Sequence, residues 1–135
     1  LINGISGNNK RYGDTEWLGF LGEDIVITIE FEKPTNINSV ATRFFNGNGQ
    51  WIYAPKEINL QLKLEDGRAI STLKKIENTK SLLVDFKLNI SQFSEDKNLK
   101  ATELKITIPS YGNIPEGKQG AGHKAWTFID EIIIN

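Results

Sequence analysis

The sequence predicts an all-β fold, an antiparallel jelly-roll β-sandwich, on three observations. Apolar residues recur at every second position over several short segments, which places them on one face of a strand. No window of a dozen residues keeps the 3.6-residue apolar stripe of an amphipathic helix. Turn sequences separate the apolar segments at intervals of about 8–12 residues, and roughly six to eight short strands spaced in this way are typical of a sandwich.

In chain order, the first strand is expected at residues 25–31, where Ile and Phe alternate with more polar side chains. Residues 40–45 are rich in β-branched and aromatic residues, with apolar side chains on both faces, as expected of a strand that is covered on both sides. Residues 58–65 alternate four aliphatic side chains with Asn, Gln, Lys and Glu, and this is the least ambiguous strand of the chain.

The second half of the chain repeats these patterns. In residues 82–88 and 104–108 apolar side chains again occupy every second position. Residues 127–134 carry apolar side chains on both faces of the expected strand and include two acids. Residues 90–100 are the best helical candidate, with Ser91 as a cap, and we expect at most one or two turns there. The turn sequences between these strands lie at residues 33–36, 46–49, 65–68 and 77–80.

The order of strands also predicts which connections lie together. Successive antiparallel strands run in opposite directions, so alternate connections emerge at the same end of the sandwich. One end should hold the long loops, which are the loop entering Ile25, residues 46–54 and residues 110–124, together with the short turn at Asn78. The other end should hold the short turns at Asn36, at Asp66 and around Ser94. Long loops displayed on a rigid scaffold indicate a binding end.

Composition restricts the function. The 135 residues, 39% hydrophobic with a net charge of −1, predict one globular domain spanning residues 1–135 and disfavour a nucleic-acid binder. The absence of Cys and the single His123 exclude thiolate and multi-histidine metal centres. No apolar run reaches the roughly 20 residues of a membrane helix, so membrane insertion is not expected. The chain begins with Leu1, and we expect a module of a larger protein.

Several motifs, in the right order along nearly the whole chain, carry a family resemblance. They are Asn3-Gly4, the Trp17-Leu18-Gly19-Phe20 run before the strand at residues 25–29, Gln50-Trp51-Ile52-Tyr53-Ala54-Pro55, Glu65-Asp66-Gly67, and Gly120-Ala121-Gly122 followed by residues 124–132. The chain thereby resembles a discoidin domain, also called a coagulation factor five/eight type C domain. It is most similar to the modules appended to bacterial glycoside hydrolases such as family 20 β-hexosaminidases. The resemblance implies a galactose-binding-like jelly roll that binds glycans and performs no chemistry.

The resemblance also implies one structural calcium ion, held by Asn3, Thr15, Asp130 and Glu131. The two acids lie inside an otherwise apolar strand, and an acid in such a strand needs a partner. The alternative is that one acid faces solvent while the other pairs with a Lys or accepts hydrogen bonds from backbone amides.

Sugars are bound by an aromatic face together with planar polar side chains. The loops that should converge supply such residues, with Trp51 or Trp126 as the stacking platform. For both tryptophans the alternative is a core role, which is also the expectation for Trp17, and His123 could simply lie at the surface. The complete set of expected ligand-binding residues is Asn46, Gln50, Trp51, Tyr111, Asn113, Lys118, His123, Lys124 and Trp126.

The sequence therefore predicts a non-catalytic carbohydrate-binding module that tethers a parent glycoside hydrolase or surface protein to glycans. As part of an exported bacterial protein it would be secreted, periplasmic or on the cell surface. The main alternative is a structural or protein-docking sandwich that packs against a catalytic domain without binding sugar. Seventeen acidic residues supply candidates for a glycosidase pair, but no motif fixes such a pair. Phospholipid binding would depend on Trp51-Ile52-Tyr53 and lacks a basic surround.

Overall fold

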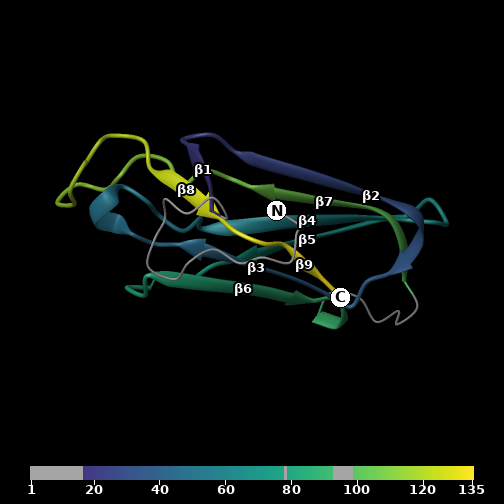
Figure 1. Ribbon diagram of the computed structural model, residues 1–135. Coiled ribbons are helices and arrows are strands. Elements are labelled where there is room, and N and C mark those ends of the chain that lie inside the picture. The colour runs from purple at the N-terminus through teal and green to yellow at the C-terminus, as the bar shows by residue number, and fades with distance from the viewer. Residues whose placement is uncertain (1–16, 78, 93–98) are drawn as a thin grey trace.

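The computed structural model describes residues 17–77, 79–92 and 99–135 as two antiparallel sheets in two layers (Figure 1). One sheet has the strand order β1-β8-β3-β6, with β9 also paired to β3, and the other has the order β2-β7-β4-β5. The predicted all-β, jelly-roll sandwich is confirmed. The strands are β1 (Leu18–Leu21), β2 (Ile25–Asn36), β3 (Ser39–Phe45), β4 (Glu57–Leu64), β5 (Ala69–Lys75), β6 (Leu83–Asn89), β7 (Lys100–Ile108), β8 (Trp126–Ile129) and β9 (Ile133–Ile134), with 3-10 turns η1 (Asn48–Gln50) and η2 (Ile90–Gln92).

The core lies between the two layers and follows from the period-two pattern. In β4 every second residue is buried, and Leu60 and Leu62 are almost inaccessible to solvent while Asn59 and Gln61 are exposed. Phe44 of β3 packs into the same cluster from the opposite sheet. Each buried aliphatic side chain of this kind contributes about 1.5–3 kcal/mol of transfer free energy. The alternation of apolar and polar residues along each strand therefore decides which of its faces is buried in the core.

Strand β2 differs from the prediction of a turn at residues 33–36. The strand continues to Asn36, and its pairing with β7 is interrupted between Glu30 and Thr35. Pro34 lies inside this interruption. Since β2 is an edge strand and proline has no N–H to donate, an irregular edge is where a sheet tolerates it.

The single strand expected at residues 127–134 is instead two strands. Both pair with β3, Phe44 opposite Ile129 in β8 and Ala41 opposite Ile133 in β9. Three residues along β3 thus correspond to four residues along the segment from β8 to β9, and this one extra residue is what defines a β-bulge. Asp130 still lies opposite Arg43, since its N donates to Arg43 O at 3.4 Å, so the extra residue falls between Asp130 and Ile133. The buried carboxylate of Asp130 pairs with Arg43 just before this interruption of the predicted strand.

The helical prediction at residues 90–100 reduces to one short turn. The 3-10 turn η2 spans Ile90–Gln92, and Lys100 already belongs to β7; residues 93–98 lie outside the described part. Two further strands, β1 and β5, were not predicted. Over the residues that the structure describes, no helix is long and apolar enough to cross a bilayer.

The two ends of the sandwich are built as strand parity predicts. At one end, called the loop end, residues 22–24, 46–56, 76–82 and 109–125 contact one another, apart from Asn78, which lies outside the described residues. At the other, called the turn end, Ile90 N donates to Asn38 O at 2.8 Å and Glu65 N donates to Lys100 O at 3.1 Å. In Figure 1 the loop end is at the left, where the green and yellow connection before β8 projects furthest.

Candidate functional site

The loop end is held together by a short parallel pairing between residues 51–53 and β8. Trp126 N donates to Trp51 O at 2.8 Å, and Tyr53 N donates to Trp126 O at 3.0 Å. Ile52 packs into the apolar cluster that also contains Trp126. Trp51 and Tyr53 lie on the other side, in the cluster with Ile114 and Tyr111 of the loop formed by residues 109–125. The two aromatic rings that flank Ile52 are therefore both directed at that loop.

Trp51 reaches its position through an unusual backbone conformation. It ends the η1 turn with φ 67° and ψ 22°, the only positive φ of a non-glycine residue in the described part of the chain. A bulky residue in the left-handed region costs about 1–3 kcal/mol, and such residues persist only where the surrounding structure holds them. Strain of this kind is concentrated at functional sites, which marks Trp51 as a candidate site residue.

The loop of residues 109–125 is a small hairpin that carries His123 to Trp51. Ile114 N donates to His123 O at 2.8 Å, and the buried Ile114 side chain anchors the hairpin. The imidazole of His123 stacks on the indole of Trp51, with ring centroids 4.7 Å apart and planes inclined by 20°. Gly120, at φ 82°, lies so close to the indole edge that a Cβ there would overlap Trp51 Nε1. The indole is thus fixed by a glycine at its edge and an exposed imidazole on its face.

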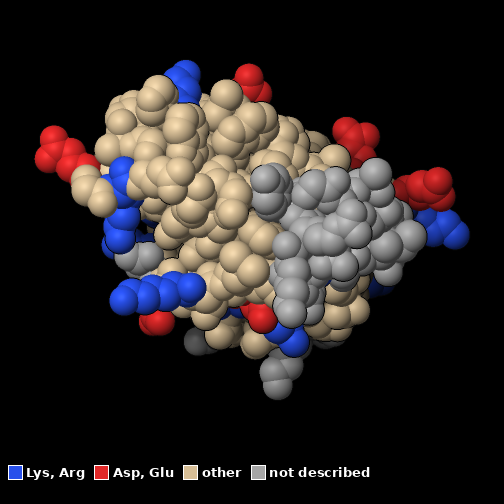
Figure 2. All heavy atoms as spheres, turned by 60° about the vertical axis from the view of Figure 1, so that its left-hand side comes forward, with Lys and Arg blue, Asp and Glu red and all other residues tan. Residues whose placement is uncertain are grey.

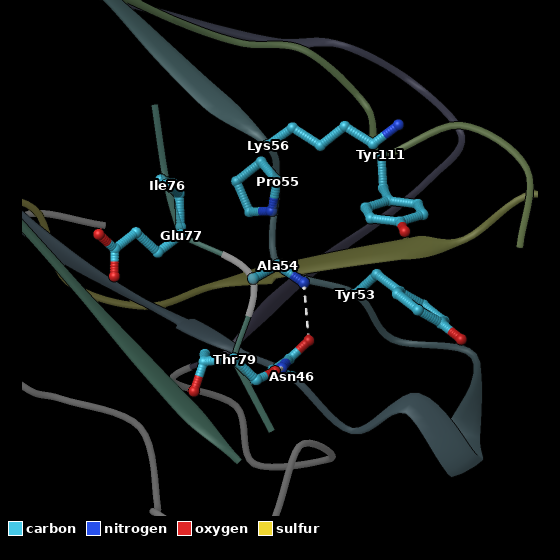
Figure 3. Close-up of a pocket in the computed structure, with 9 residues that line it drawn as sticks. All are labelled: Asn46, Tyr53, Ala54, Pro55, Lys56, Ile76, Glu77, Thr79 and Tyr111. Carbon is cyan, nitrogen blue, oxygen red and sulfur yellow. Dashed lines mark hydrogen bonds between the residues drawn. The ribbon is translucent and has the colours of Figure 1, made fainter. Parts of the chain in front are cut away.

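A second pair of rings lies beside the first. Tyr53 and Tyr111 have centroids 4.7 Å apart with planes inclined by 36°, and Lys56 Nζ lies 4.7 Å from the Tyr111 centroid. Figure 3 shows Lys56 on one side of the Tyr111 ring and Tyr53 on the other. Both faces of Tyr111 are therefore in contact within the protein.

Tyr53 is buried, and its hydroxyl has no hydrogen-bond partner among the described residues. Burial, reinforced by Tyr111, raises the pKa of the Tyr53 hydroxyl, so that it stays protonated. A buried donor without a partner costs about 1–3 kcal/mol.

An open cavity of about 240 Å³ adjoins the tyrosines. Pro55, Ala54 and Ile76 supply apolar wall, while Asn46 and Thr79 supply polar groups, and Figure 3 places Glu77 and Tyr111 on opposite sides of Pro55. Pockets for drug-sized ligands usually span about 300–1,000 Å³, so this one suits a ligand the size of a single sugar ring.

Asn46 holds the cavity together. Its Nδ2 donates to Thr79 O and Ser81 O at 3.0 and 3.1 Å, and its Oδ1 accepts from Ala54 N at 3.1 Å. One amide thereby joins the segment before β4 to the turn before β6. The structure gives Asn46 a positioning role within the predicted site.

The other predicted ligand-binding residues fall into two groups. Gln50, Asn113, Lys118 and Lys124 are exposed at the loop end, with Asn113 and Lys124 bridged in the hairpin. Trp126 instead lies in the cluster of Trp17, Phe45 and Phe128, where its ring meets Phe128 at 5.9 Å edge to face. The expectation that Trp17 is a core residue is confirmed, since it is 5% exposed.

Sequence reasoning missed Lys56 as a site residue. Tyr53 was noted as an aromatic side chain of the converging loops but was left out of the expected ligand-binding set. Nothing in the sequence indicates that Lys56 lies over Tyr111, because that contact depends on the path of the distant hairpin.

The predicted calcium ligands are only half described. Asn3 and Thr15 lie outside the described residues, and Asp130 Oδ2 accepts from Arg43 Nε at 2.8 Å and lies 2.7 Å from its Nη2. A guanidinium on a carboxylate competes with a metal ion for that oxygen. No group of three or more His, Asp or Glu side chains suited to a metal occurs in the described part of the chain. The calcium ion stays a prediction.

Comparison with known proteins gives a likeness of fold. No protein-family profile matches the chain, and no curated protein sequence matches it significantly. Among solved structures the chain is similar to a CBM28 carbohydrate-binding module, described as specific for non-crystalline cellulose. The TM-score is 0.50 at 10% sequence identity, over 88% of this chain and 73% of the module. The chain therefore has the β-sandwich fold of a carbohydrate-binding module, while membership of the discoidin family stays a prediction.

Proposed function

We propose that this chain is a non-catalytic glycan-binding module that uses the loop end as its binding surface. One observation carries the proposal: three segments far apart in the sequence bring two ring stacks and a sugar-sized cavity together at one end of the sandwich. Aromatic rings with adjacent amides and hydroxyls are the groups that recognise sugars. The fold likeness to a carbohydrate-binding module supports the same function.

The wider role we propose is tethering. A discoidin-like module attached to an exported bacterial glycoside hydrolase or surface protein would hold that protein near its glycan. A small, shallow site gives weak affinity, and attachment converts weak binding into a higher local concentration of the partner domain. We propose no catalytic activity for this chain.

The view from the loop end supports a ligand recognised by contact and shape. Figure 2 shows charged side chains of both signs around the margin of this face and other residues in its middle. A broad field of one sign is therefore lacking on the visible, described surface, consistent with the net charge of −1.

A glycan array tests this function, with Trp51→Ala and Tyr111→Ala beside the wild type. Each substitution removes one ring of a different stack, and we expect either one to weaken glycan binding about tenfold or more. Leu73→Ala is the matched control, because Leu73 is half exposed on the outer face of β5, away from the loops. Melting curves establish that each variant is folded.

The outcome also separates this function from its alternative, a docking sandwich. A well-folded wild type that binds no glycan contradicts the proposal. In that case the same loop end would be an interface with a neighbouring domain.

A further inference from the structure

We infer that the tyrosine cavity of the loop end selects a terminal sugar acid, a sugar ring carrying one carboxylate, which Lys56 recognises. This inference rests on the proposed function and names the ligand class of that site. The first ground is the order of side chains in each ring stack. Buried Tyr53 lies beneath Tyr111, and Lys56 lies over Tyr111; half-buried Trp51 lies beneath exposed His123.

The outer member of both stacks is thus a basic side chain. A neutral sugar would be expected to lie on an open aromatic face, but the two faces of Tyr111 are already in contact with Lys56 and Tyr53 (Figure 3). A ligand entering the cavity therefore meets an ammonium group at the Tyr111 end.

Lys56 is available for an anionic ligand. Its side chain is exposed, and no carboxylate of the described residues lies within ion-pair distance of its ammonium group. Its contact with the Tyr111 ring is a weak interaction at an exposed site, whereas a carboxylate would form a stronger, charge-assisted hydrogen bond. The aromatic contact holds the ammonium in place without neutralising it.

The rest of the cavity limits the ligand to one carboxylate. Glu77 lines the side of the cavity opposite Tyr111, so a second negative group there would be repelled (Figure 3). The chain as a whole has a net charge of −1, which gives no long-range attraction for a polysulfated chain. A single uronic acid at a glycan terminus satisfies both conditions, with its ring in the 240 Å³ cavity and its carboxylate at Lys56.

The experiment compares sugars that differ only at C6. Titration calorimetry with methyl galactosiduronic acid against methyl galactoside, and with methyl glucuronide against methyl glucoside, isolates the carboxylate. We expect the acid of at least one pair to bind roughly tenfold tighter than its neutral partner. Raising the salt from 0.15 M to 1 M should reduce that preference.

Three variants locate the preference. Lys56→Gln should remove it, and Lys56→Arg should keep most of it because the charge remains. Lys105→Gln, a matched loss of charge at an exposed residue on the outer face of β7, should leave it unchanged. Lys56 is exposed, so these changes should leave the melting temperature close to that of the wild type.

The outcomes separate the two proposals. If neutral and acidic partners bind equally, or if Lys56→Gln retains the preference, the sugar-acid inference is wrong and glycan binding at the loop end still stands. If neither kind of sugar binds and the glycan array is also negative, both proposals are wrong.

Discussion

The loop end and the turn end of this sandwich connect the same strands in different ways. At the turn end, the hairpin at residues 65–68 closes with short-range contacts, where Asp66 Oδ1 accepts from Arg68 N and Gly67 N donates to Leu64 O. At the loop end, contacts join residues 33 to 72 positions apart, such as Asn46 with Thr79 and Trp51 with His123.

The difference shows what each end can do. The hairpin at residues 65–68 is closed by its own neighbours and is complete as a local unit, although longer-range hydrogen bonds such as Ile90 N to Asn38 O also join the turn end. The loop end is complete only when distant segments meet, and where they meet they leave an open cavity and a strained tryptophan. Substitutions at the loop end should therefore affect stability and binding together, and those at the turn end only stability.

The largest effect is expected for Gly120→Ala. The new Cβ would overlap the indole of Trp51, and φ 82° is unfavourable for alanine, so we expect a loss of about 2–4 kcal/mol together with loss of glycan binding. Denaturant unfolding and glycan titration measure the two effects.

Two glycines serve as controls for this substitution. Gly122 in the same hairpin and Gly67 at the turn end also have positive φ, but a Cβ at either would meet open space. Alanine there should cost only about 1–2 kcal/mol from the backbone. Equal losses at all three positions would show that the approach of Gly120 to Trp51 has no importance.

Asn46→Ala should have the next largest effect. It removes two donated hydrogen bonds and one accepted bond that join the loops, and we expect a loss of about 1–3 kcal/mol. Binding should weaken in the folded variant because the cavity wall is no longer held. Asn59→Ala, on the exposed face of β4, is the control and should be nearly neutral. Unchanged binding by folded Asn46→Ala would contradict its positioning role.

Lys74→Met tests the side of the sandwich between the two ends. Lys74 Nζ donates to Lys87 O at 2.6 Å and lies 5.5 Å from the Phe86 centroid, which joins the edge strand β5 of one sheet to the edge strand β6 of the other. We expect a loss of about 1 kcal/mol with glycan affinity unchanged. The exposed neighbour Lys75→Met is the control, and a change in affinity would show that the sheet edge takes part in binding.

Asp66→Asn at the turn end should have the smallest effect. Hydrogen bonds from the backbone and side chain of Arg68 lower the pKa of Asp66, so its contribution to stability is present above the unfolded value of about 4. That contribution is lost as the pH falls through the lower, folded-state pKa. Melting curves of the two proteins should differ slightly at pH 7 and converge in acid, below the folded-state pKa; a gap that widens in acid would contradict this assignment.

The sequence predicted the fold because the pattern that defines a strand, the alternation of apolar and polar residues, lies within a few neighbouring residues. Alternation in β4 and β6, and apolar residues at both parities in β3, fixed which side chains are buried. Strand β1 was missed because it has four residues and includes Gly19, and β5 because its inward side chains include Thr72 and Lys74. Strand parity was enough to place the long loops at one end.

The details of the site were not predictable in the same way. The stacking of His123 on Trp51 depends on a positive φ at Trp51 and on the path of a hairpin more than fifty residues later. Trp126 was expected as a platform, yet its place in β8 directs it into the cluster with Phe128. Residue types indicated sugar-binding chemistry, whereas the pairs that share a contact depend on tertiary structure.

In the proposed function the glycan binds at the loop end and at no other surface. Amide chemical-shift mapping during titration with the best glycan from the array tests this location. We expect shifts at Trp51, Tyr53, Tyr111 and His123, with Asp66, Gly67 and the outer faces of both sheets unchanged. Shifts concentrated on a sheet face such as Asn59, Gln61 and Lys105, with the loop end unchanged, would contradict it.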